Sequence, residues 1–204
     1  MAYDNRSRAA AAQATRAAVL AAARDAFLDA GYAGTTIRAV AEAAGVSPET
    51  VYKRFGGKAG LLKAVYDVAM AGDDDPVPIA ERPEFLAVRT ASTTAEVAAA
   101  YAAYARLLTG RAGPLMRVVL SARGTDPDLD AFVRTVDGER LIGATMATTG
   151  WAEKGWLRGD PDRSRDHLWM LISPAVWALF AERGWTLDDY ETWLRTTLTA
   201  TILA

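Results

Sequence analysis

Apolar residues recur three and four positions apart along almost the whole chain, and the alternation of apolar and polar residues that marks strands is scarce. Alanine, leucine and arginine, which favour helices, are abundant. The pattern therefore predicts an all-α protein with no parallel sheet. We expect about nine helices, over residues 13–30, 37–44, 48–55, 58–70, 93–109, 113–123, 126–152, 160–183 and 186–203.

A run of helix breakers and like charges, Gly72-Asp73-Asp74-Asp75-Pro76-Val77-Pro78, predicts a linker. We therefore expect a first domain over residues 1–70 and a second over residues 71–204. Three adjacent aspartates could hold a hard cation, but no spaced oxygen ligands follow them, which favours a solvated linker.

The composition argues against most enzyme chemistry. The 204 residues are 51% hydrophobic and 24% charged, contain no cysteine and have one histidine, His167, so thiolate nucleophiles and Cys- or His-based metal sites are unavailable. Around Gly56-Gly57-Lys58 a phosphate loop would need a glycine where Tyr52 stands and a hydroxyl where Ala59 stands. We expect neither an enzyme nor a cofactor or metal.

No apolar stretch approaches the ~20 residues that span a bilayer, and the polar amino terminus carries no cleavable apolar segment. We therefore expect a cytoplasmic protein without a membrane partner. Residues 1–70 hold nine Lys/Arg against six acids, a charge of +3, whereas the remainder carries −5. This asymmetry indicates a polyanion partner for the first part, although solvated helical faces often carry as much charge.

Residues 36–55, TIRAVAEAAGVSPETVYKRF, have the spacing of a DNA-reading helix-turn-helix. Small Ala41 lets two short helices approach, Gly45 permits a left-handed turn, and Val46 and Val51 fill the space between the helices. A generic helical corner would also use glycine and small residues. Such a corner would not need the hydroxyl-bearing and cationic surface formed by Ser47, Thr50, Tyr52, Lys53 and Arg54.

From about Arg16 to Val68 the sequence resembles the tetracycline-repressor-like (TetR) family of bacterial transcriptional regulators. The most specific matching residues are Phe27, Gly31-Tyr32, Thr35-Thr36, Gly45-Val46-Ser47, Tyr52, Phe55 and Lys58. The resemblance implies a ligand-responsive repressor that binds a palindromic, double-stranded operator as a homodimer. The alternative is a helical small-molecule-binding protein or adaptor that keeps the fold without reading DNA.

The resemblance also assigns DNA-contacting roles. It implies that Thr36 and Ser47, which can equally be plain helix caps, contact phosphates together with neighbouring backbone N–H groups. Departures from the family pattern are Glu49, an acid that repels phosphate but can accept from the cytosine amino group, and Arg54. The resemblance implies that Thr36, Ser47, Tyr52 and Lys58 contact phosphates and that Glu49, Thr50 and Lys53 face base edges. Arg38 and Pro48 complete the implied DNA-binding set.

The expected helix over residues 160–183 is apolar nearly all the way round, so it must be covered on every side. A second copy of the chain could cover one side of this helix, and the last expected helix carries apolar residues at helical spacing that would join the same interface. The alternative is that the helix is buried within a monomer. We expect Pro174 to kink or loosen this helix locally. The predicted dimer interface is Trp177, Phe180, Tyr190, Trp193, Leu194 and Leu198.

Flexible and aromatic side chains in the middle of the chain suit the wall of a cavity, although such stripes more often form ordinary core. The resemblance implies that a small molecule, apolar or aromatic, binds there and shifts the helix at Lys58–Met70, which releases the DNA. The predicted ligand-binding residues are Tyr66, Tyr101, Tyr104, Met116, Met146, Trp169 and Met170.

Overall fold

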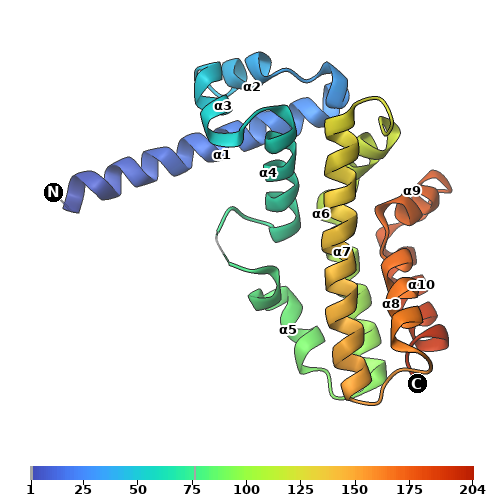
Figure 1. Cartoon of the computed structure of the whole chain (residues 1–204). Coiled ribbons are helices and arrows are strands. Elements are labelled where there is room, and N and C mark those ends of the chain that lie inside the picture. The colour runs from blue at the N-terminus through green and yellow to red at the C-terminus, as the bar shows by residue number, and fades with distance from the viewer. Residues whose placement is uncertain (1, 76) are drawn as a thin grey trace. The chain divides into compact units, whose positions relative to one another are not determined.

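The computed structural model describes residues 2–75 and 77–204, so that Pro76 of the expected linker lies outside the described residues (Figure 1). Within them the chain forms ten α-helices and one short 3-10 segment, which confirms the all-α prediction. The elements are α1 (Ala2–Gly34), α2 (Ile37–Ala43), α3 (Pro48–Phe55), α4 (Lys58–Ala71), η1 (Ile79–Glu81), α5 (Pro83–Thr90), α6 (Thr94–Ser121), α7 (Pro127–Glu153), α8 (Pro161–Leu171), α9 (Pro174–Glu182) and α10 (Leu187–Thr201).

The chain divides into two compact units. The first comprises the chain up to Asp74 together with Pro114–Phe132, and the second comprises Asp75–Gly113 and Val133–Ala204. The expected boundary after residue 70 did not include residues 114–132 in the first unit. These residues belong there because their apolar side chains pack on the first helices: the ring of Phe132 meets that of Tyr66 edge-on, with 5.5 Å between the centroids.

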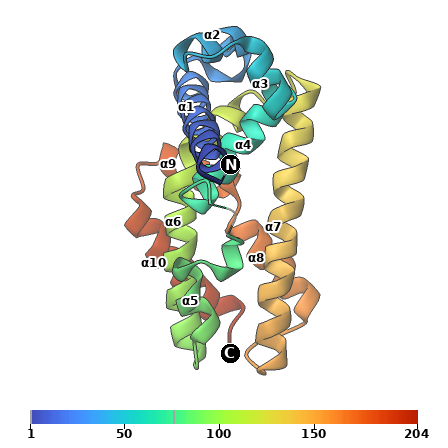
Figure 2. The same ribbon diagram turned by 90° about the vertical axis from the view of Figure 1, so that its left-hand side faces the viewer.

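The first unit is built on α1 and α4, which α2 and α3 cover. Figure 2, which looks along α1, shows α2 and α3 together at one side of that helix. Phe27, Val40, Leu61 and Leu62 are almost completely buried in this unit. Burial of such side chains contributes roughly 1.5–3 kcal/mol each, so the unit has its own hydrophobic core.

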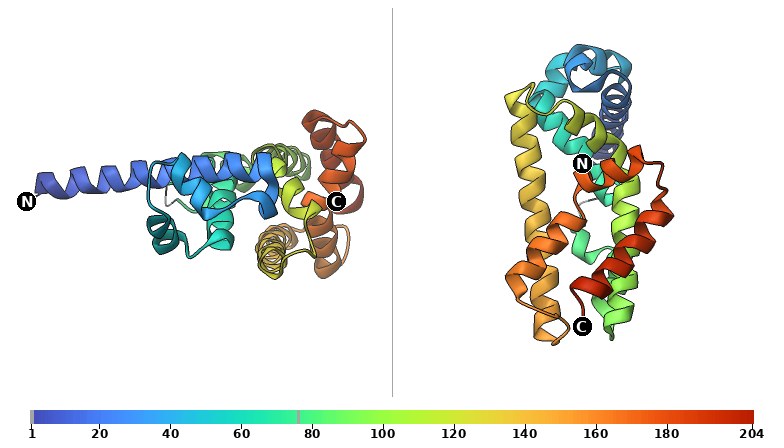
Figure 3. Two further views of the ribbon diagram at one scale, coloured as in Figure 1. Left: turned by 90° about the horizontal axis from the view of Figure 1, so that it is seen from above. Right: turned by 90° about the vertical axis from the view of Figure 1, so that its right-hand side faces the viewer.

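The second unit is richer in aromatic side chains. Its core joins residues of α5–α8 and α10, and the rings of Tyr101 and Trp151 meet edge-on at 5.4 Å. Helices α8, α9 and α10 follow one another at the end of the chain (Figure 3, right). An isolated antiparallel bridge between Leu157 and Leu203 fastens the last residues of the chain.

The predicted helices over residues 93–109 and 113–123 are one helix, α6, which continues through Pro114. The predicted gap after residue 109 is wrong, because Gly110 and Gly113 are packing positions within a continuous helix. A Cβ on Gly110 would lie 3.1 Å from Leu187, and one on Gly113 would lie 3.2 Å from Trp177. These glycines let the side chains of α10 and α9 approach the α6 backbone.

The predicted helix over residues 160–183 is two helices, α8 and α9, so Pro174 follows a complete break where a local kink or loosening was expected. A residue before proline is pushed out of the helical region, and Ser173 has an extended backbone with ψ 133°. Its hydroxyl then accepts the Ala175 N–H at 3.3 Å, which caps the new helix. Helix α5 was not predicted, and α1 begins at Ala2, eleven residues before the expected start.

Candidate DNA-binding site

The turn between α2 and α3 has the geometry that the sequence predicted. Gly45 has a φ of 67°, a left-handed conformation that side chains disfavour, and the Val46 N–H donates to the Ala41 carbonyl at 2.9 Å. Ala41 and Val51 are fully buried where the two helices meet. The turn and the buried inner faces of α2 and α3 hold the two helices together. The outward face of α3 is therefore held in a fixed position.

Two hydroxyls cap the helices at the start of this motif. Thr36 accepts the Ala39 N–H at 3.1 Å, and Ser47 accepts the Thr50 N–H at 3.3 Å. Ser47 also shares a hydrogen bond of 3.2 Å with the Thr50 hydroxyl. Both caps are exposed, so each oxygen can fill its structural role and still face a ligand.

Helix α3 separates its buried and exposed side chains cleanly. Val51 and Phe55 point inward, whereas Glu49, Tyr52 and Lys53 are exposed, with 56% of Tyr52 accessible. Residues 49 and 53 are one turn apart and therefore share a face. Of the other predicted contacts, Arg38 on α2 is exposed, and Pro48 and Thr50 are half-buried.

The carboxylate of Glu49 is stabilised at the start of α3. Hydrogen bonds from its own backbone N–H and from the Ser47 side chain hold the pKa of Glu49 below its ordinary value of 4.5. The side chain is therefore ionised at neutral pH. It places one negative charge beside Lys53 on the face that was predicted to meet DNA.

Two cations near α3 are engaged within the first unit. The ammonium of Lys58 donates to the Tyr32 carbonyl at 3.0 Å and lies 4.2 Å from the centre of the Tyr32 ring. Arg54 donates to the carbonyl of Ala12 on α1 at 2.8 Å. Lys58, a predicted phosphate contact, thus fastens the start of α4 to the end of α1, and a phosphate would have to compete with that interaction.

Sequence reasoning missed Arg16. Its guanidinium pairs bidentately with Asp74, at 2.6 and 3.0 Å, and lies 5.3 Å from the centre of the Phe55 ring. Arg16 therefore joins α1 to the end of α3 and to the segment that follows α4. The pair is 58 residues apart, so no local spacing signals it. Asp74, expected in a solvated linker, is an ion-pair partner.

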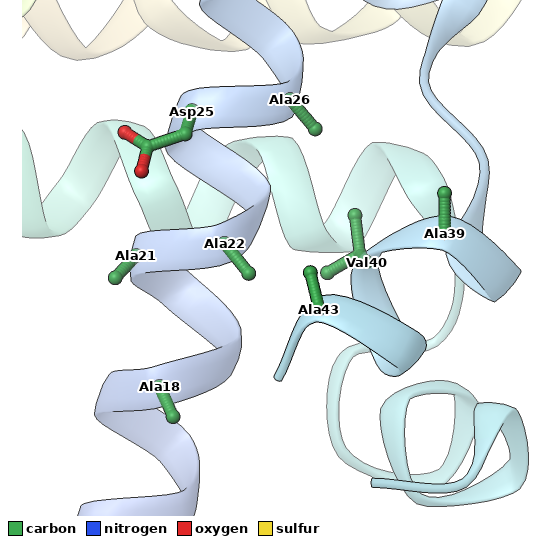
Figure 4. A pocket seen from close by; sticks show the side chains of 8 residues that line it. All are labelled: Ala18, Ala21, Ala22, Asp25, Ala26, Ala39, Val40 and Ala43. Atoms are coloured by element: carbon green, nitrogen blue, oxygen red, sulfur yellow. The ribbon is translucent and has the colours of Figure 1, made fainter. Parts of the chain in front are cut away.

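A groove of about 530 Å³ lies between α1 and α2 in the first unit (Figure 4). Its walls are mostly alanine methyl groups, and Asp25 is its only ionisable side chain. None of the seven predicted ligand-binding residues lines it. Among the described residues no group of three or more His, Cys, Asp or Glu side chains could hold a metal ion.

The predicted ligand-binding residues are divided between the two units. Tyr66 and Met116 are buried in the first unit. In the second, Tyr101 is buried, Tyr104 and Trp169 are half-buried, and Met146 and Met170 are 65% and 48% exposed.

Tyr104 has an unusual environment in the second unit. Its ring packs on Phe85, with centroids 5.0 Å apart, and its buried hydroxyl has no hydrogen-bond partner among the described residues. Burial, with a smaller contribution from the negative charge of Glu84, raises the pKa of Tyr104 to about 12. The hydroxyl is therefore protonated and able to donate.

The predicted dimer residues also fall into two groups. Tyr190, Leu194 and Leu198 are at most 1% exposed and belong to the core of the second unit, so they are already covered within one chain. Trp177, Phe180 and Trp193 are half-buried. Helix α9 has no buried residue, and its Leu179, which lies in the predicted apolar stretch but was not singled out, is 64% exposed.

The locked helix pair, its left-handed turn and the polar face of α3 define a helix-turn-helix DNA-binding protein. Residues 19–65 match the family described as bacterial regulatory proteins, tetR family. The chain is 30% identical over 181 residues, 87% of its length, to the uncharacterized HTH-type transcriptional regulator YdeS of Bacillus subtilis (strain 168), of which it covers 84%. The chain belongs to the TetR family of transcriptional regulators and is not an enzyme.

Solved structures agree on the fold. A TetR transcriptional regulator from Chloroflexus aurantiacus J-10-FL is similar with a TM-score of 0.63 and 25% identity, over 94% of this chain and 97% of that one. The regulator FadR from Bacillus subtilis, solved in complex with stearoyl-CoA, has a TM-score of 0.68 and 18% identity, over 90% and 97%. None of the described helices is both long and apolar enough to cross a membrane.

Proposed function

We propose that this regulator is a ligand-responsive repressor that binds a palindromic operator as a homodimer. The observation that carries the proposal is the exposed polar face of α3, which is held by the fully buried Val51 and Ala41. Hydroxyl and cationic groups on a rigid short helix suit the edges of bases in the major groove. A buried core beneath them fixes their positions before binding, which reduces the ordering cost.

In this proposal Glu49, Thr50 and Lys53, flanked by Pro48, face the bases. Thr36, Arg38, Ser47, Tyr52 and Lys58 contact phosphates on both sides of the groove. Thr36 and Ser47 support this role because their exposed oxygens lie at helix starts, where backbone N–H groups attract anions. Lys58 would exchange its contact with Tyr32 for a phosphate.

A second copy of the chain explains the apolar surface of α9. Leu179 is exposed and the neighbouring rings of Trp177 and Phe180 are only half-buried, although all three are large and apolar. Such a surface favours an isologous contact about a two-fold axis, with Trp193 of α10 at its side. Two recognition helices would then be set about 34 to 36 Å apart, one turn of duplex.

The effector is proposed to be a small apolar or aromatic molecule bound by the second unit. The Tyr104 hydroxyl, which has no hydrogen-bond partner among the described residues and whose ring packs on Phe85, supports this, since a buried donor without a partner is costly unless a ligand satisfies it. The regulator FadR, whose fold is similar, was solved in complex with stearoyl-CoA, which supports an acyl compound as one ligand to test. An effector that binds the DNA-free form more tightly than the DNA-binding form by ~1 to 3 kcal/mol would lower operator affinity about 5- to 150-fold.

Selection of bound duplexes from a random pool tests DNA reading. We expect enrichment of an inverted repeat by the wild type and a changed preference for Lys53→Ala. A thermal-shift screen with apolar acids, aromatic compounds and acyl-CoA thioesters then tests the effector, and a stabilising compound should release the selected duplex. Stabilisation by a compound without any enriched duplex would favour the alternative, a ligand-binding protein that does not read DNA.

A further inference from the structure

Two tyrosines of α6 lie on the same side of that helix in the second unit. Tyr101 and Tyr104 are three positions apart, so their side chains are neighbours on one face, here called the tyrosine face. The Tyr101 ring meets that of Trp151 edge-on at 5.4 Å, and the Tyr104 ring meets that of Phe85 at 5.0 Å. The buried Tyr104 hydroxyl has no hydrogen-bond partner among the described residues. The tyrosine face therefore combines aromatic rings with a donor that a ligand could satisfy.

Arg140 of α7 carries a positive charge into the same unit. Its side chain is 9% exposed, whereas that of Asp137, its ion-pair partner at 2.6 Å, is 36% exposed. The guanidinium also donates to the Trp169 carbonyl, and it lies 5.1 Å from the centre of the Trp169 ring. Water screens the outer carboxylate more than the inner guanidinium, so the positive charge acts more strongly on the interior of the unit.

The charge of Arg140 reaches the tyrosine face. Burial raises the pKa of Tyr101, and the positive charge of Arg140 opposes this increase. Besides burial, the charge of Glu84 acts on Tyr104, but Glu84 is paired at 3.0 Å with Arg111, whose charge acts on Tyr104 in the opposite sense. The surroundings of the two hydroxyls therefore favour a negatively charged group over a positively charged one.

Helix α5 offers a way to the Tyr104 hydroxyl. It lies beside α6 and covers Tyr104 with the ring of Phe85 (Figure 2). Among the residues of α5, all of which the structure describes, only Val88 is buried, and Leu86 is 53% exposed. Little buried apolar surface holds α5 in place, so a small displacement of this helix costs little and admits a ligand.

We propose that the effector is an apolar acid, whose carboxylate accepts a hydrogen bond from Tyr104 and is attracted by Arg140, while its apolar part lies among the aromatic rings of the tyrosine face. The inference rests on the proposed binding of an effector by the second unit and names its chemical class. An ionised acceptor makes a stronger hydrogen bond with a hydroxyl than a neutral acceptor does. Arg140 would repel an amine, and a neutral ligand would gain nothing from its charge.

Isothermal titration calorimetry at neutral pH compares octanoate, decanoate and phenylacetate with their primary amides. The two members of each pair share the same apolar part, and only the acid is charged. We expect at least one acid to bind the wild-type chain about 10-fold or more tightly than its amide does, as a hydrogen bond to a charged group requires.

Tyr104→Phe removes the hydroxyl and keeps the ring. The acid should then bind about 10-fold or more weakly than it binds the wild type. The variant without ligand should melt at the same temperature or higher, because it loses no hydrogen bond within the chain. A merely structural role of the hydroxyl would instead lower the melting temperature.

Arg140→Met removes the charge, so an acid and its amide should bind this variant alike. Arg165→Met is the control: Arg165 of α8 is 28% exposed and paired with Asp162 at 2.8 Å, and its loss should leave the preference for the acid unchanged. Tryptophan fluorescence shows whether Arg140→Met keeps its fold, because Arg140 contacts Trp169. If it does not, the acid and amide comparison in the wild type and Tyr104→Phe decide the question.

Equal affinity of the wild type for acid and amide, unchanged acid affinity in Tyr104→Phe, or a preference for the acid that survives in a folded Arg140→Met would overturn the inference. So would a neutral compound that stabilises the wild type in the broader screen while every acid fails, a result that leaves the proposed function intact. If no compound of any class binds, the proposed ligand response has itself failed and the inference with it.

Discussion

Helices α3 and α9 begin in the same way and present opposite surfaces. Each is short, has proline in its first turn and is capped by a serine, Ser47 or Ser173, whose hydroxyl accepts a backbone N–H. Yet α3 buries Val51 and Phe55 and exposes polar and charged side chains, whereas α9 buries none of its side chains completely and exposes Leu179.

The comparison shows that the local start signal determines where a helix begins but not what it binds. The polar, cationic outer face of α3 is stably hydrated in the free protein, and a polyanion can replace that water. Helix α3 is therefore suited to bind DNA. On α9 a large leucine is exposed beside half-buried aromatic rings, and contact with another apolar surface would remove it from water. Helix α9 is therefore suited to bind a second protein chain.

The largest effect is expected from Leu179→Arg on α9. A charge buried without a partner at the centre of a protein interface should cost ~3 kcal/mol or more, which weakens the dimer at least about 100-fold. Because Leu179 is 64% exposed in the single chain, folding should be little affected. Sedimentation equilibrium measures the change. Leu86→Arg, at a leucine of α5 that is 53% exposed, is the control and should leave the dimer intact.

Next in size is Lys53→Ala on α3, which should leave the dimer unchanged. Loss of one base-edge contact is expected to cost ~1 to 3 kcal/mol in each half-site, or about 5- to 150-fold in affinity per half-site, and to relax the preference at one position of each half-site. Titration of single-base variants of the operator gives the result. Lys63→Ala removes an equal charge at a residue paired with Asp67 and should not alter that preference; an equal change there would contradict the assignment.

A moderate effect on stability is expected from Arg16→Ala. Its ion pair with Asp74 is only partly exposed, at 32% and 24%, and its ring contact with Phe55 adds to it, so the free energy of unfolding of the first unit should fall by ~1 to 2 kcal/mol. All six tryptophans lie in the second unit, so fluorescence would miss this change. Hydrogen exchange of α1 and α3 should detect it. Asp74→Asn, which keeps the contact between Arg16 and the Phe55 ring, should lower the free energy of unfolding by about half as much.

The smallest effect concerns Glu49. Because its pKa is lowered in the folded chain, the ionised carboxylate stabilises the start of α3 at neutral pH, and this stabilisation disappears as the pH falls below the ordinary value of 4.5 through the folded pKa. Hydrogen exchange of the α3 amides should therefore be faster in Glu49→Gln than in the wild type at pH 7, and equal in the two at acidic pH. A difference that persists at low pH would contradict this.

The helix-turn-helix could be predicted closely from sequence because its signals are local. Gly45 needs a left-handed backbone, Ser47 caps its own helix, and Ala41 and Val51 are buried on the helices at either side of a short turn, so residues close in sequence determine each feature. These positions were assigned correctly without knowledge of the rest of the molecule.

The rest depended on contacts between distant parts of the chain. The gap predicted between residues 109 and 113 is continuous helix, and the sequence does not show the side chains of Leu187 and Trp177 that pack on Gly110 and Gly113. The apolar stripe of α10 suggested a dimer surface, but its most regular members, such as Leu194, fill the core of their own unit. Periodicity identifies a side that must be covered, and only the fold shows what covers it.

The most direct test of the account is the stoichiometry and symmetry of the complex with the selected operator. Sedimentation of protein with that duplex should give an even number of chains per duplex, and hydroxyl-radical footprints should be related by a two-fold axis, with half-site centres about 34 to 36 Å apart or a multiple of that spacing. A single chain bound to an asymmetric site, or the same complex formed by Leu179→Arg at equal affinity, would contradict the account.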